Sequence, residues 1–114
     1  MPLNYNLSKV YELSDNDNEF AVTIVSLFLD EVPAEVKMIK AGIENKDYQQ
    51  VYQAAHKIKP TLDLLCMYLA YEANLKIMNW TKAEGQKKEI IEVYKELKQF
   101  VDDTAKEIKK DFNL

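Results

Sequence analysis

The sequence predicts an all-α protein, an antiparallel four-helix bundle with a short N-terminal helical extension. Only two glycines and three prolines occur in 114 residues, which are too few turn-forming residues for an all-β fold. Hydrophobic residues make up 47% of the chain, enough for one packed core. Apolar residues recur at the spacing of amphipathic helices. We therefore expect a single domain over residues 1–114, with the extension over 1–18 and the bundle over about 19–112.

The first half of the chain is expected to contain a short helix and a longer one. Residues 7–13 form a short amphipathic segment that covers one end of the core. The cap-forming run 14–18 then precedes a helix over about 19–32. Pro33 marks a kink or a new first turn, because proline is tolerated at the start of a helix but not in its interior. The helical pattern continues beyond it to a break at 44–46.

Three further helices are expected after that break. Asp47 followed by Gln50 resembles a capping box, which opens a helix that runs to about Leu65. Another helix over 69–80 follows, and Gly85 lies in the turn after it. The last helix is long, and its apolar residues have the spacings of four and three that are typical of a bundle seam. This seam consists of Ile90, Tyr94, Leu97, Val101, Ala105, Ile108 and Phe112.

Charge and composition argue against several classes of partner. Nineteen acidic residues oppose fifteen basic ones, all of them lysines, so the net charge is −4. A nucleic-acid-binding surface usually has a basic patch with arginines, so no nucleic acid is expected. The longest apolar stretch, 20–29, is shorter than a membrane span, and no secretion signal is visible. The only cysteine, Cys66, excludes an internal disulfide and fits a reducing compartment. We therefore expect a cytoplasmic monomer that does not bind membranes.

His56, the only histidine, is the most informative residue of the chain. On a helix with about 100° per residue, His56 lies roughly 150° from the middle of the apolar arc. That arc consists of Val51, Ala54, Ala55, Ile58, Leu62, Leu65 and Leu69. His56 shares the opposite stripe, here called the His56 ridge, with Gln49, Tyr52, Gln53, Lys59, Pro60 and Asp63. Because imidazole is a good nitrogen nucleophile near neutral pH, this ridge is the candidate site of chemistry.

Most enzymatic and metal sites lack residues that they need. One cysteine and one histidine are too few for tetrahedral zinc, and the paired Glu-x-x-His motifs of di-iron bundles are absent. No glycine-rich loop is present to hold a nucleotide. A Ser-His-Asp triad stays open, because its members could meet in space. Cys66, expected about three turns beyond His56 on the same helix, is too distant to be its partner and is interpreted as a buried spacer.

The residues around His56 resemble those of the histidine-containing phosphotransfer (HPt) domains of multistep phosphorelays. The core of the HPt motif is Ala-His-x-(Leu/Ile)-Lys followed by a small residue or proline, and the chain has Ala55-His56-Lys57-Ile58-Lys59-Pro60. Leu27-Phe28-Leu29-Asp30-Glu31-Val32-Pro33 is similar to the Phe-Leu…Pro segment of the family. Asn45-Lys46-Asp47-Tyr48 is similar to its Gly-Asp-aromatic segment. The resemblance covers about residues 20–71.

The chain departs from the HPt pattern at two positions. Cys66 and Pro60 stand where many members of the family have glycine, although proline also occurs at the second position. Proline removes the N–H that would bond the carbonyl of His56, so a bend is expected there.

The resemblance implies a phosphorelay intermediate. His56 would accept a phosphoryl group through Nε2 from the aspartyl phosphate of a receiver domain and pass it to another receiver aspartate. Lys59, one turn on, would stabilise the phosphoryl oxygens by its charge, whereas Lys57 lies about 100° around the helix. No cofactor of its own is expected, because the receiver brings the divalent metal. The implied partners are response-regulator receiver domains and a hybrid sensor kinase.

The implied partner-binding surface is the His56 ridge. Tyr52 is either an apolar anchor for the receiver or a side chain that lies flat on a neighbouring helix. Asp63 could repel phosphate, pair with Lys59 or remain a solvated carboxylate. Two other functions stay open: a docking module that binds a receiver without phosphoryl transfer, and a structural helical module, which burial of His56 would favour.

Overall fold

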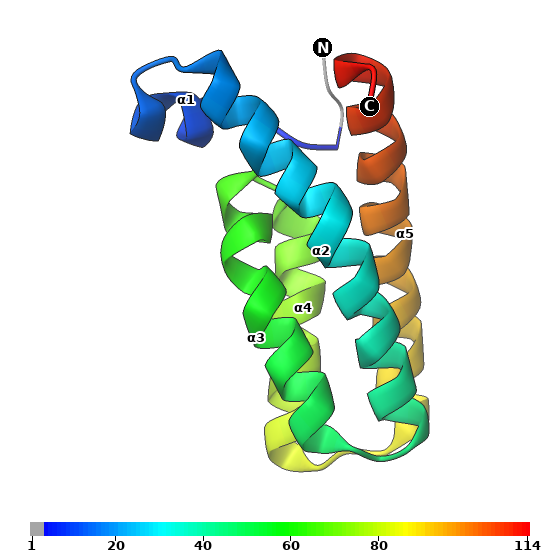
Figure 1. Cartoon of the computed structure of the whole chain (residues 1–114). Helices are drawn as coiled ribbons and strands as arrows, with labels where there is room; N and C mark the ends of the chain where they lie inside the picture. Colours follow the sequence, from blue (N-terminus) through cyan, green and yellow to red (C-terminus); the bar gives the residue numbers. More distant parts are fainter. Residues whose placement is uncertain (1–3) are drawn as a thin grey trace.

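The computed structural model describes residues 4–114, and within them it contains five α-helices and no strand (Figure 1). The helices are α1 (Ser8–Ser14), α2 (Asn18–Glu44), α3 (Tyr48–Leu64), α4 (Tyr68–Ala83) and α5 (Lys87–Phe112). The all-α prediction is confirmed, including the short helix before the four long ones. Residues 1–3 of the predicted extension lie outside the described residues.

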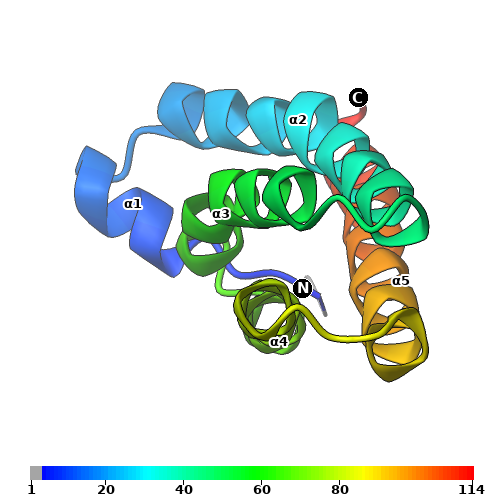
Figure 2. The same ribbon diagram turned by 90° about the horizontal axis from the view of Figure 1, so that it is seen from below.

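The four long helices pack closely against one another. α2 packs against α3, α3 against α4, α4 against α5, and α5 back against α2, while α1 packs against α2 (Figure 2). The buried apolar side chains of all five helices form one contiguous core. Within the described part of the chain, no helix combines the length and the apolar character that crossing a membrane would require.

α2 runs without a break through Pro33, so the alternative of a new helix start at this residue is wrong. The helix begins at the predicted cap cluster, where the Asp17 carboxylate accepts hydrogen bonds from the backbone N–H groups of the first turn. Val32 and Val36 on either side of the proline are buried in the core, which holds the helix together across it. The axis of α2 changes direction near its middle (Figures 1 and 2), as expected where a proline removes a helical hydrogen bond.

A tight turn joins α2 to α3 and sets where α3 begins. Lys46 has a left-handed backbone with φ 54°, and the N–H of Asp47 donates to the carbonyl of Gly42 at 2.8 Å. The Asp47 carboxylate accepts from the backbone N–H of Gln50 at 3.1 Å, as the sequence predicts. The Gln50 side chain does not complete the capping box; it donates to the carbonyl of Met38 at 3.0 Å and so ties α3 to α2.

A second turn of this kind ends α3 and corrects two predictions. Cys66 has φ 55°, its N–H donates to the carbonyl of Asp63, and the N–H of Met67 donates to that of Leu62, each at 3.0 Å. Cys66 is therefore a half-buried turn residue, not a buried spacer on the helix of His56. Leu69 follows the turn and is 65% exposed, so its predicted place in the core arc is wrong.

Replacing Cys66 with glycine should stabilise the protein by about 0.5–1 kcal/mol, because glycine adopts a left-handed backbone without the steric cost of a Cβ atom. Thermal unfolding followed by circular dichroism measures the change. Cys66→Ala is the matched control, since it removes the thiol and keeps the Cβ atom. A glycine variant no more stable than the alanine variant would contradict this interpretation of the turn.

Candidate functional site

The structure confirms the two opposite faces predicted for the helix of His56. The His56 side chain is exposed. Ala55 and Ile58, which flank it on the core side, have relative exposures of 0% and 1%, and Leu62 and Leu65 are both at 0%. His56 lies in the middle of α3, so the helix presents it to solvent while its neighbours anchor the backbone in the core.

All members of the predicted His56 ridge lie on α3, but they differ in exposure. Tyr52 and Lys59 are half-buried. The exposed members are Gln49, Gln53, His56, Pro60 and Asp63. Pro60 lies within α3, which continues beyond it to Leu64. Because proline has no N–H, the His56 carbonyl lacks its usual helical donor, although the helix does not end there.

The imidazole of His56 is stacked on the ring of Tyr52, one turn earlier on α3. The two ring centroids lie 5.8 Å apart and the ring planes differ by 21°. The Nζ atom of Lys82, which comes from α4, lies 5.8 Å from the centroid of the Tyr52 ring. Tyr52 therefore contacts both the predicted nucleophile and a cation of the neighbouring helix. Helix periodicity places Tyr52 beside His56, but the contact with Lys82 was not predicted.

The charged residues near His56 differ in whether they form ion pairs, and Lys59 is unpaired among the described residues. Lys57 pairs with Glu35 of α2, with Nζ and Oε1 3.1 Å apart. Asp63 pairs with Lys9 of α1, with Oδ1 and Nζ 2.9 Å apart. The predicted alternative in which Asp63 pairs with Lys59 is therefore wrong. The hydrogen bond from Lys9 to the Asp63 carboxylate, together with the attraction between their charges, raises the pKa of Lys9.

A buried polar contact lies beneath the site and was not predicted. The side-chain amide of Asn74 on α4 is fully buried, and its Nδ2 donates to the carbonyl of Ala55 at 2.8 Å. This bond ties α4 to the residue that precedes His56. The Oδ1 atom of Asn74 is buried and has no hydrogen-bond partner among the described residues. The available signal in the sequence was an asparagine between Ala73 and Ile77, on the apolar face of its helix.

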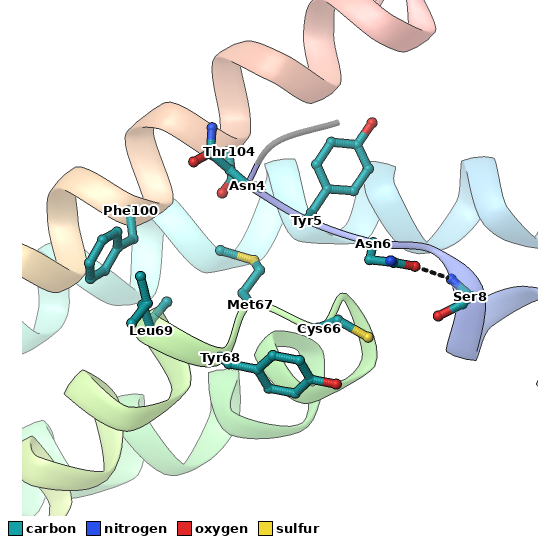
Figure 3. A pocket seen from close by; sticks show the side chains of 11 residues that line it. Asn4, Tyr5, Asn6, Ser8, Cys66, Met67, Tyr68, Leu69, Phe100 and Thr104 are labelled. Atoms are coloured by element: carbon teal, nitrogen blue, oxygen red, sulfur yellow. Dashed lines mark hydrogen bonds between the residues drawn. The ribbon is translucent and has the colours of Figure 1, made fainter. Parts of the chain in front are cut away.

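The structure also contains a pocket of about 430 Å³, whose lining side chains are drawn in Figure 3. It is formed by the segment before α1, the α3–α4 turn, the start of α4 and part of α5. Its lining includes Cys66, Tyr68 and Phe100, but none of the residues of the His56 ridge. In the described part of the chain, no group of three or more His, Cys, Asp and Glu side chains is placed to hold a metal ion.

Comparison with known proteins identified no relative. A scan against protein-family models, a search of curated proteins and a search of solved structures found no match.

Proposed function

We propose that this protein is a phosphorelay intermediate that carries a phosphoryl group on His56 between receiver-domain aspartates. One observation carries the proposal: the only histidine projects into solvent from the middle of α3, and Lys59, one turn away, makes no ion pair with any of residues 4–114. A carrier of this kind needs an accessible nucleophile and a nearby positive charge, because the receiver domain brings the remaining groups.

The backbone supports the resemblance to HPt domains at two positions. Lys46 and Cys66 have left-handed backbones with φ 54° and 55°. In the HPt segments that the chain resembles, both positions are commonly glycine, the residue that adopts this conformation most readily. The helix boundaries around His56 are thus of the kind that the family pattern would produce, although the side chains at both positions differ.

The fold that belongs to this proposal is the antiparallel four-helix bundle predicted from the sequence. α2–α5 would form the bundle, and α1 with the segment before it would form the extension. The packing of each long helix against the next, and of α5 against α2, supports this arrangement. Such a bundle presents the middle of α3 on an outer face, where a second protein can reach it.

In the proposed reaction the lone pair of His56 Nε2 attacks the phosphorus of a receiver aspartyl phosphate. The N–P bond forms as the P–O bond of the acyl phosphate breaks. The electron pair of that P–O bond stays on the aspartate oxygen, which becomes a carboxylate again. The positive charge of Lys59 offsets the charge on the phosphoryl oxygens. The second transfer is the same step in reverse, onto the aspartate of another receiver.

The proposed docking surface joins the His56 ridge to α2. Met38 is 46% exposed, and its backbone carbonyl accepts the side-chain bond from Gln50 of α3. We propose that this exposed apolar side chain of the preceding helix belongs to the docking surface together with the polar ridge. A carrier must release each partner, so we expect a small interface at the low end of the range for protein pairs.

The proposal assigns the phosphate source and the metal to the partners. No glycine-rich nucleotide loop occurs in the sequence, so the phosphoryl group would come from a receiver domain, such as that of a hybrid sensor kinase. The receiver would also supply the divalent metal. We place the reaction in the cytoplasm and propose that the protein acts as a monomer.

Transfer of label from a phosphorylated receiver domain tests the proposal. The protein is incubated with a receiver that carries a ³²P-aspartyl phosphate, and the products are separated by electrophoresis. We expect label on this protein that is lost in acid and retained in alkali, as for a phosphohistidine. A stable complex without label would instead identify a docking module that binds a receiver and transfers nothing.

The Lys59→Ala variant should accept the phosphoryl group about tenfold more slowly than the parent, because it loses one charged contact and keeps the nucleophile. Single-turnover transfer from the receiver measures the rate. Lys57→Ala is the matched control, since Lys57 pairs with Glu35, and it should transfer at nearly the parent rate. Equal rates for Lys59→Ala and the parent would remove Lys59 from the site.

A further inference from the structure

We propose that Tyr52 is a positioning residue for His56 and that Lys82 holds it in place from α4; this inference rests on the phosphorelay function proposed above. Its basis is the stack of the two rings, with centroids 5.8 Å apart and planes 21° from parallel. The Lys82 ammonium, 5.8 Å from the centre of the Tyr52 ring, adds a contact from a second helix.

The two rings differ in how firmly the fold holds them. Tyr52 is half-buried and packs against the hydrophobic core, whereas His56 is exposed. An exposed imidazole by itself turns freely about its χ1 and χ2 bonds. Side chains four residues apart on a helix are neighbours, and stacked aromatic rings attract each other beyond the burial of their area. The better-held tyrosine ring therefore restricts the rotation of the imidazole.

Restricting the imidazole matters because phosphoryl transfer requires an in-line approach of Nε2 to phosphorus. Every ring orientation that points Nε2 elsewhere lowers the fraction of productive encounters. Lys82 contributes indirectly: a cation over a tyrosine ring is attracted by the ring face, so it limits the movement of Tyr52 away from α4. Lys59 remains the cation proposed to meet the phosphoryl oxygens.

Tyr52 could instead act as an apolar anchor for the receiver, and a donor without a protein surface separates the two roles. Phosphoramidate supplies such a donor: the His56 Nε2–P bond forms as the P–N bond of the reagent breaks, and ammonia leaves. A positioning residue affects this reaction as well as transfer from a receiver. An anchor affects only transfer from a receiver.

The decisive variants are Tyr52→Leu, which removes the ring, and Tyr52→Phe, which keeps it. We expect Tyr52→Leu to react with phosphoramidate about three- to tenfold more slowly than the parent, and Tyr52→Phe to react at the parent rate. Phe100→Leu, which removes a half-buried aromatic ring from α5, is the matched control and should leave the rate unchanged. Lys82→Gln changes an exposed residue and should slow the reaction about twofold.

Proton NMR supplies a readout that does not depend on phosphoryl transfer. The His56 ring protons should show a ring-current shift and nuclear Overhauser contacts to Tyr52 in the parent and in Tyr52→Phe, and lose both in Tyr52→Leu. A parent rate with phosphoramidate in a folded Tyr52→Leu variant would overturn the proposal, as would the absence of ring contacts in the parent. If the parent shows the contacts but accepts no phosphoryl group from either donor, the phosphorelay function fails and the positioning role fails with it.

Discussion

The His56→Gln variant is expected to accept no phosphoryl group from a phosphorylated receiver, while its thermal unfolding stays close to that of the parent. Glutamine keeps a polar side chain on the helix but has no nucleophilic nitrogen. His56 is exposed, and substitutions of exposed helix residues usually change the free energy of unfolding within about ±0.5 kcal/mol. The single-turnover labelling assay and a thermal melt measure the two quantities on the same preparation.

Gln99→Ala is the matched control for this experiment, because Gln99 is an exposed helix residue of α5 outside the His56 ridge. It should still be labelled. Label retained in His56→Gln would show that another residue carries the phosphate. A large loss of stability in His56→Gln would mean that the histidine has a structural role in packing.

The Gly42→Ala variant should lower the free energy of unfolding by about 1–3 kcal/mol, because it forces extra volume into a closely packed contact between α2 and α3. A Cβ atom at Gly42 would lie 2.5 Å from Cγ2 of Val51 and 3.2 Å from the carbonyl oxygen of Asp47. Helix propensity alone favours the opposite sign, since alanine stabilises a helix interior by about 1 kcal/mol relative to glycine. Urea denaturation therefore distinguishes the two effects by the direction of the change.

A double-mutant cycle with Val51→Ala locates the cause of that loss. Val51→Ala removes the Cγ2 atom that the new methyl group would meet, so Gly42→Ala should cost less in this background than in the parent. A Gly42→Ala variant more stable than the parent would show that the two helices adjust without strain. An equal cost in both backgrounds would point to the backbone of α3 in place of the Val51 side chain.

The helices and the exposure of His56 could be predicted because they depend on patterns within single segments. A period of 3.6 residues places Ala55, Ile58 and Leu62 on one arc and His56 on the other. In the structure the first three are buried and His56 is exposed. The errors arose where a backbone feature interrupts a pattern. The apolar arc was extended to Leu69, but the helix ends before it in a turn where Cys66 has a left-handed backbone. Cysteine rarely adopts this conformation, so the sequence gives no sign of the turn.

The contacts around His56 could be predicted only in part, because most of them join different helices. Helix periodicity places Tyr52 beside His56, but it does not reveal that Lys82 of α4 reaches the same ring. The pairing of Asp63 with Lys9 likewise depends on where α1 lies, which no local pattern specifies. Asn74 was missed for the same reason: its partner is a backbone carbonyl of another helix.

The most direct test of the proposed function is ¹⁵N NMR of the uniformly labelled protein after incubation with a phosphorylated receiver. We expect the signal of His56 Nε2 to move and to show coupling to phosphorus, while Nδ1 carries no phosphoryl group. This result would place the phosphate on the predicted atom of the only histidine. An unchanged imidazole spectrum in a protein that carries alkali-stable label, with the phosphate on a lysine nitrogen, would contradict the assignment of His56 as the carrier.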